Sequence, residues 1–90
     1  MLFRRFIVSG RVQGVGYRYF ILSAALSHGI RGWVRNKVDG SVEVYAEADE
    51  AGLVSFKVDL KQGPVGSHVR SVVEKRLPIS DSFSSFTIRG

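Results

Sequence analysis

The sequence predicts an α+β fold in which two helices lie on one face of an antiparallel β-sheet. Segments that indicate strands and segments with a helical apolar period follow one another in the order β-α-β-β-α-β, with a short strand at the end. Glycines stand where both helices are expected to end, and an Asp-Gly pair separates the two middle strands. This order is the split βαβ pattern of ferredoxin-like sandwiches.

The first strand and the first helix are predicted on either side of a glycine-rich connection. Apolar and β-branched side chains are dense over about residues 2–9, which indicates a strand. From Tyr17 to Ala24 apolar side chains recur at i, i+3, i+4 and i+7, which is one face of a helix over about residues 16–28. Gly29 is expected to end that helix.

The middle of the chain predicts a β-hairpin. Strands are expected at about residues 31–37 and 41–48, the second of which alternates with a period of two. Asp39-Gly40 between them predicts a type I′ turn, in which both central residues have φ > 0.

The second helix is expected between Asp49, as its N-terminal cap, and Gly63. Glu50 suits the positive end of the helix dipole. A fourth strand is predicted over residues 68–77, a loop over 78–82 and a short last strand within 83–90.

Composition limits the classes of protein that this chain can be. Ninety residues fit a single domain, 1–90, and the absence of cysteine excludes disulfides, a thiolate nucleophile and cysteine-ligated metals. With no signal peptide or membrane span predicted, we expect a cytoplasmic protein and, by default, a monomer. The net charge of +5 favours anionic partners in general without choosing among them.

The connection "GRVQGVGYR" (residues 10–18) has the composition of an anion-binding loop. The first N–H groups of a helix lack intrahelical acceptors and attract anions, and Gly14 and Gly16 let successive N–H groups converge. Arg18 in the first turn is unfavourable for the dipole, and a bound anion would explain it. The alternative is a plain turn with a surface arginine. The spacing fits neither a P-loop nor a dinucleotide fingerprint.

Asn36 is the second unusual residue, because asparagine is disfavoured within a strand. It could simply end the strand before the turn. In the predicted topology, however, neighbouring strands can bring Asn36 close to the loop after the first strand, where its carboxamide could orient a water molecule.

These segments together carry a family resemblance. "GRVQGVGYR", "GWVRNKVDGSVEVYAE" (residues 32–47) and the later "GP" resemble the acylphosphatase family, over about residues 3–90. The resemblance implies a hydrolase of acid anhydrides that splits acyl phosphates into a carboxylate and inorganic phosphate without metal or cofactor. It implies catalytic roles for Arg18 and Asn36. The implied phosphate loop comprises Gln13, Gly14, Val15, Gly16, Tyr17 and Arg18. Departures at Ala48 and Ser67 touch neither catalytic position.

An acyl phosphate makes modest chemical demands. Its carboxylate leaves without a strong general acid, and phosphoryl transfer depends mainly on positioning and charge stabilisation. The expected partners are therefore a small acyl phosphate and inorganic phosphate, the latter as product and competitive ligand, with neither nucleic acid nor membrane. Acetyl phosphate, carbamoyl phosphate and 1,3-bisphosphoglycerate all present the same phosphate end.

The sequence also leaves alternative functions to consider. The same element order serves RNA-recognition modules, but Glu43 and Glu47 on the third strand would repel RNA phosphates. These glutamates are expected to be solvated, and Trp33 and Tyr45 are expected to lie in the core or to cover the sheet. His28 and His68 lie far apart in sequence and are not expected to bind metal. A module that binds an anion without hydrolysing it is the main alternative function.

Overall fold

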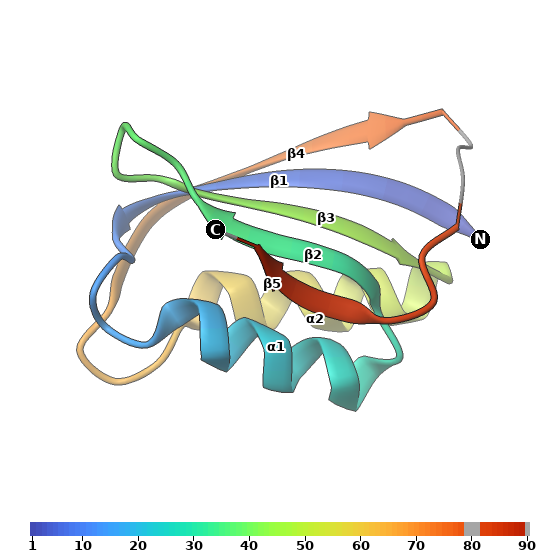
Figure 1. Cartoon of the computed structure of the whole chain (residues 1–90), viewed down its shortest axis with the longest axis horizontal. Helices are drawn as coiled ribbons and strands as arrows, with labels where there is room; N and C mark the ends of the chain where they lie inside the picture. Colours follow the sequence, from blue (N-terminus) through green and yellow to red (C-terminus); the bar gives the residue numbers. More distant parts are fainter. Residues whose placement is uncertain (79–81, 90) are drawn as a thin grey trace.

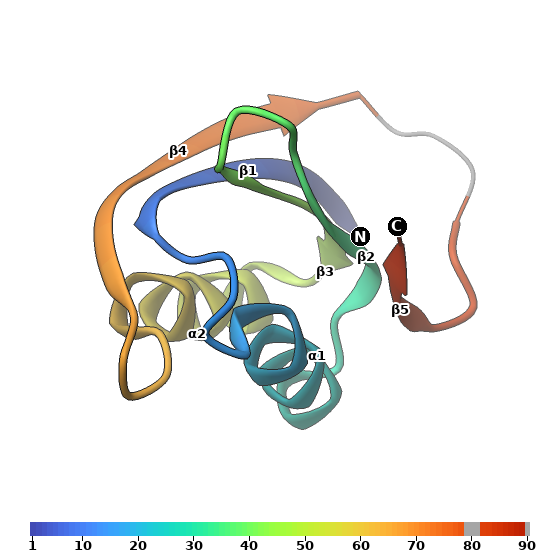
Figure 2. The same cartoon turned by 60° about the vertical axis from the view of Figure 1, so that its left-hand side comes forward.

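The computed structural model describes residues 1–78 and 82–89 and has the predicted order of elements. These are β1 (Leu2–Arg11), α1 (Tyr17–His28), β2 (Arg31–Asn36), β3 (Val42–Ala48), α2 (Glu50–Gln62), β4 (His68–Leu77) and β5 (Phe86–Arg89). Figures 1 and 2 show both helices side by side on one face of the sheet. The predicted loop over 78–82 falls partly outside the described residues, as does Gly90.

The sheet has the order β4-β1-β3-β2-β5. All neighbouring strands are antiparallel except β5, which runs parallel to β2. The ferredoxin-like prediction is therefore confirmed, with one parallel pair at the edge. Because β1 and β2 are both antiparallel to β3, they run in the same direction and end at the same end of the sheet.

Strand β1 is longer than the predicted residues 2–9, because it continues through Gly10 to Arg11. The register shifts between Ser9 and Gly10, after which Gly10 pairs with Val69 and Arg11 with His68. Gly10 has φ 124°, and an added Cβ would clash with the backbone of His68. The glycine therefore marks a β-bulge rather than a strand end.

The β2–β3 turn also differs from its prediction. No non-glycine residue among those described has a positive φ, so Asp39 cannot take part in a type I′ turn. Instead the Gly40 N–H donates to Lys37 O at 3.2 Å, and the Lys37 N–H donates to Ser41 O at 2.8 Å. With Gly40 at φ 92°, this is a three-residue loop whose left-handed position is glycine.

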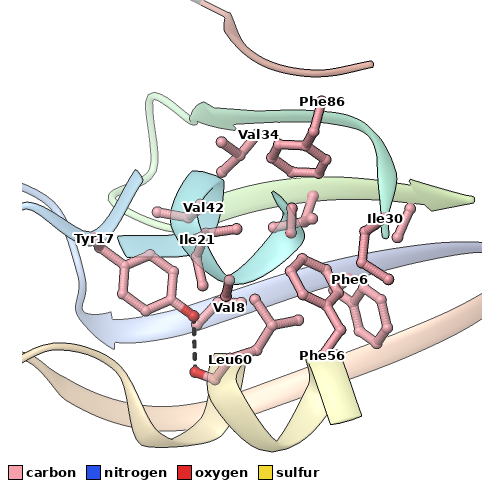
Figure 3. Close-up of a cluster of buried hydrophobic side chains, with 14 of the residues drawn as sticks. Phe6, Val8, Tyr17, Ile21, Ile30, Val34, Val42, Phe56, Leu60 and Phe86 are labelled. Carbon is pink, nitrogen blue, oxygen red and sulfur yellow. Dashed lines mark hydrogen bonds between the residues drawn. The ribbon is translucent and has the colours of Figure 1, made fainter. Parts of the chain in front are cut away.

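The core lies between the helices and the sheet. Rows of paired residues such as Phe6–Val44–Val34 cross the sheet on the helix side and are fully buried. Helix α1 packs Tyr17 and Ile21 against them, as the helical period predicts (Figure 3). Helix α2 contributes Leu53, Phe56 and Leu60. Burying one such large apolar side chain stabilises the fold by about 1.5–3 kcal/mol.

The opposite face of the sheet is covered at Glu43 and Glu47, the two glutamates that the sequence predicts to be solvated. Glu47 is fully buried, and it accepts hydrogen bonds from Ser82 Oγ at 2.7 Å and the Phe83 N–H at 3.0 Å. Glu43 is buried between Arg5 and Arg35, at 2.7 and 2.6 Å. The prediction that both glutamates are solvated is wrong, because flanking arginines and the segment before β5 cover them.

Electrostatics keep these carboxylates charged. Burial alone would raise the pKa of the Glu43 carboxyl, but hydrogen bonding to Arg35 and the charges of Arg35 and Arg5 outweigh it and hold that pKa below its ordinary value.

Trp33 stacks on Tyr45 on the same face of the sheet, with ring centroids 6.0 Å apart, and the Arg89 guanidinium lies 4.9 Å from the Trp33 ring. The two aromatic rings therefore cover the sheet, as expected.

Candidate active site

The connection between β1 and α1 owes its shape to two glycines. Gly14 and Gly16 have φ 74° and 76°, a region in which residues with a Cβ are strained. A Cβ added at either position would meet nothing within 4 Å. The two glycines are therefore required by backbone conformation, and open space remains beside them.

Helix α1 begins at this connection without a side-chain cap. Gly16 is its N-cap residue and provides no capping hydrogen bond, and the first turn holds no acidic residue. The Phe20 N–H donates to Gly16 O at 3.0 Å, so the helical ladder starts there. The N–H groups that precede it have no intrahelical acceptor and suit an anion.

Tyr17 belongs to this site through its backbone alone. Its side chain is 1% exposed, and its hydroxyl donates a hydrogen bond to Leu60 O at 2.8 Å (Figure 3). Burial raises the pKa of the Tyr17 hydroxyl far above its ordinary value. The phenol therefore ties the start of α1 to α2, while its N–H group remains at the connection.

Arg18 occupies the first turn of α1 and is half-buried. Within residues 1–78 and 82–89, no carboxylate forms an ion pair with its guanidinium and no hydrogen bond engages it. By contrast, Arg4, Arg5, Arg31 and Arg35 all pair with glutamates. The Arg18 fork is thus available to bind two oxygens of one anion.

Asn36 is placed by the sheet register. Val8 pairs with Val42, and Val42 pairs with Asn36, so these three residues form one row across the sheet. Val8 and Val42 are fully buried on the helix side, and Asn36 takes the third place in that row. Two strand spacings put its Cα about 10 Å from that of Val8. The sequence predicted that neighbouring strands bring Asn36 close to the loop after the first strand. In the structure β1 and β2 are not neighbours, because β3 lies between them.

The Asn36 carboxamide has an unsatisfied acceptor. Its Oδ1 is buried and accepts no hydrogen bond from the described residues. Leaving a buried acceptor unpaired is unfavourable by about 1–3 kcal/mol, so such an atom often marks a functional site. A shallow cavity of about 320 Å³ lies beside it, lined by residues 35–39.

Gln13 links the two halves of the site, which sequence reasoning missed. Its Nε2 donates hydrogen bonds to Lys37 O at 2.8 Å and to Ser41 O at 2.9 Å. The glutamine side chain therefore contacts the β2–β3 hairpin, and only its N–H remains for the anion loop. No local sequence pattern predicts this contact, because Lys37 and Ser41 lie 24 and 28 residues away from Gln13.

Other predicted features fall outside this site. His28 ends α1 and bonds to Asp59 Oδ2 at 2.6 Å, while His68 starts β4 on the surface. Across the described part of the chain, no three His, Asp or Glu side chains are arranged to hold a metal ion. None of the described helices has the length and apolar character needed to span a bilayer.

Comparisons with known proteins agree on one family. The acylphosphatase family model matches residues 4–88. An acylphosphatase of Koribacter versatilis is 45% identical over 97% of this chain and 79% of its own, and one of Pasteurella multocida is 44% identical over 99% of both chains. The crystal structure of acylphosphatase from Bacillus subtilis superimposes with a TM-score of 0.97 at 40% identity, covering both chains completely.

Proposed function

The chain belongs to the acylphosphatase family, and from this premise we propose that it hydrolyses the carboxyl–phosphate bond of small acyl phosphates. Water attacks the phosphorus atom, the bond from phosphorus to the carboxyl oxygen breaks, and a carboxylate and inorganic phosphate leave. We assign the reaction to one site that combines the β1–α1 connection with Asn36 at the end of β2.

In this proposal the phosphate is held by charge and by N–H groups. The N–H groups of residues 13–18 surround its oxygens at the uncapped start of α1. Arg18 binds two of those oxygens and stabilises the charge that spreads over them in the transition state. Among residues 1–78 and 82–89 its guanidinium has no carboxylate partner to displace, which lowers the energetic cost of binding the phosphate.

Asn36 orients the attacking water. Its buried Oδ1 has no donor in the described part of the chain, and we assign that role to the attacking water molecule. This atom is the observation that carries the proposal, because a purely structural asparagine at the end of a strand would satisfy its own carboxamide. A phosphate oxygen of the substrate accepts the proton from the water. The leaving carboxylate needs no general acid, so neither metal nor cofactor is required.

The test is hydrolysis of benzoyl phosphate in EDTA by the wild type, Arg18→Ala and Asn36→Ala, with spontaneous hydrolysis subtracted. Metal-free turnover that each substitution strongly reduces supports the reaction and both assignments. A folded wild type that does not hydrolyse the substrate contradicts the proposal. Phosphate binding that persisted in that case would favour the non-catalytic anion-binding module.

Several expectations from the sequence stay predictions. These are a single domain over residues 1–90, a cytoplasmic monomer, and inorganic phosphate as a competitive inhibitor. Sedimentation of the purified protein tests the monomer, and product inhibition with phosphate tests the last.

A further inference from the structure

We propose that Gln13 is a positioning residue for Asn36. Its side-chain amide holds the β2–β3 hairpin against the anion-binding connection and so sets the distance between the bound phosphate and the oriented water. This inference rests on the proposed function of Asn36. It assigns to Gln13 a role beyond that of its N–H group, which we include in the phosphate loop.

The two hydrogen bonds of Gln13 reach the peptide groups that frame Asn36. Lys37 directly follows Asn36, and Ser41 directly precedes Val42, the cross-strand partner of Asn36. Both carbonyl oxygens already accept one hydrogen bond within the turn, from Gly40 and Lys37. The Gln13 amide uses their second lone pairs, and its two N–H donors match two acceptors.

The hairpin turn has little other support. Pairing between β1 and β3 ends at Val8–Val42, after which β1 continues along β4 alone. Residues 37–41 thus extend beyond the last β1–β3 pair, at the end of the sheet where the β1–α1 connection begins (Figure 1). In the part of the chain that is described, Gln13 is the one side chain from outside the turn that hydrogen-bonds to residues 37–41.

The local chemistry makes Gln13 hard to replace. A methionine of similar length fills the space but donates nothing, so each of the two carbonyl oxygens keeps only the hydrogen bond that it accepts within the turn. A glutamate carboxylate is worse, because it brings a negative charge against two carbonyl oxygens. Those oxygens also raise the pKa of such a carboxyl above the ordinary glutamate value of about 4.3. Once protonated, it regains one donor.

The first experiment is a double-mutant cycle with Gln13→Met and Asn36→Ala, using benzoyl phosphate. Gln13→Met is expected to lower kcat on the order of 10²-fold, as small displacements of reacting groups do, and to leave the inhibition constant of phosphate unchanged. In the Asn36→Ala background it should lower kcat no further. An equal loss in both backgrounds, or no loss in either, overturns the proposal. Gln62→Met, at the exposed end of α2, is the matched control.

A second variant covers the case in which Gln13→Met folds poorly. Gln13→Glu should gain activity as pH falls through the pKa of its carboxyl, while the wild type and Gln62→Glu show no such gain. A pH profile that matches the wild type overturns the proposal. A merely structural role predicts a change in thermal stability without this pH-dependent recovery.

The link can also be measured without turnover. The side-chain NH₂ resonances of Asn36 should shift or broaden in Gln13→Met and stay unchanged in Gln62→Met. If the wild type does not hydrolyse benzoyl phosphate, the proposed function fails, and this signal alone decides whether Gln13 positions Asn36. An unchanged Asn36 signal in Gln13→Met overturns the inference.

Discussion

The two helices of this protein begin in opposite ways. At the start of α2 the Asp49 carboxylate accepts a hydrogen bond from the Gly52 N–H at 2.7 Å, and Glu50 adds a second negative charge to the first turn. At the start of α1 the cap residue is Gly16, no acid is present in the first turn, and Arg18 places a positive charge there.

The difference separates stability from function. Both helix starts expose N–H groups that need an acceptor. Helix α2 satisfies one of them with the Asp49 carboxylate, whereas α1 has no such side-chain cap and is held by the buried side chains of Tyr17 and Ile21. We propose that an external anion accepts from the N–H groups of α1. We therefore expect substitutions at the α1 start to affect activity and those at the α2 start to affect stability.

The largest effect is expected for Arg18→Ala. Loss of the guanidinium removes the positive charge that stabilises the phosphate oxygens in the transition state, and kcat/KM for benzoyl phosphate should fall by roughly 10³-fold or more. Arg18→Lys should recover little, because a lysine lacks the planar fork. Arg76→Ala is the control and should retain full activity, because Arg76 lies at the end of β4 that is far from the β1–α1 connection. Normal turnover by Arg18→Ala would contradict the functional role that we give to the start of α1.

Asn36→Ala should come next. Without its carboxamide the attacking water loses its orientation, and kcat should fall about 10²–10³-fold. The inhibition constant of phosphate should stay at the wild-type value, because the proposed mechanism gives Asn36 no contact with the phosphate. A weakened phosphate inhibition with normal kcat would reverse the roles that we give to Asn36 and Arg18.

Gly14→Ala sharpens the comparison at the level of the backbone. The substitution meets no steric obstacle, but its φ of 74° is strained for alanine, so we expect a loss of about 1–2 kcal/mol in the free energy of unfolding. Phosphate should also bind more weakly if the loop relaxes. Chemical denaturation and phosphate inhibition measure the two effects. A stability equal to that of the wild type would show that the strain is absent.

Asp49→Ala should have the smallest effect. It removes the cap of α2 and is expected to lower the free energy of unfolding by about 1 kcal/mol, with kcat/KM unchanged. Asp49→Asn keeps a side-chain acceptor and should recover most of that stability. Altered kinetics in folded Asp49→Ala would mean that the two helix starts are not functionally separate.

Local patterns predicted most of the fold. The Asp49 cap, the glycines after both helices and the bounds of β4 follow from residue types within a few positions of each other. The errors lie where distant segments meet. The burial of Glu47 depends on Ser82 and Phe83, and the continuation of β1 past Gly10 depends on pairing with β4.

The candidate site divides in the same way. Glycine spacing and an arginine that is unfavourable for the helix dipole predict an anion site within residues 10–18, and the family resemblance implies residues 13–18 as its phosphate loop. These assignments stay predictions. The bridge from Gln13 to Lys37 and Ser41 could not be predicted, because it requires the sheet register and the exact shape of the turn. The wrong turn type at Asp39 came from a dipeptide preference that the three-residue loop overrode.

The most direct test is a titration of the ¹⁵N-labelled wild type with inorganic phosphate, followed by amide NMR. We expect the largest chemical-shift changes at the N–H groups of residues 13–18 and none at the start of α2, around residues 50–53. Changes centred on α2, or saturable phosphate binding that leaves residues 13–18 unaffected, would contradict the claim that the uncapped start of α1 is the anion site.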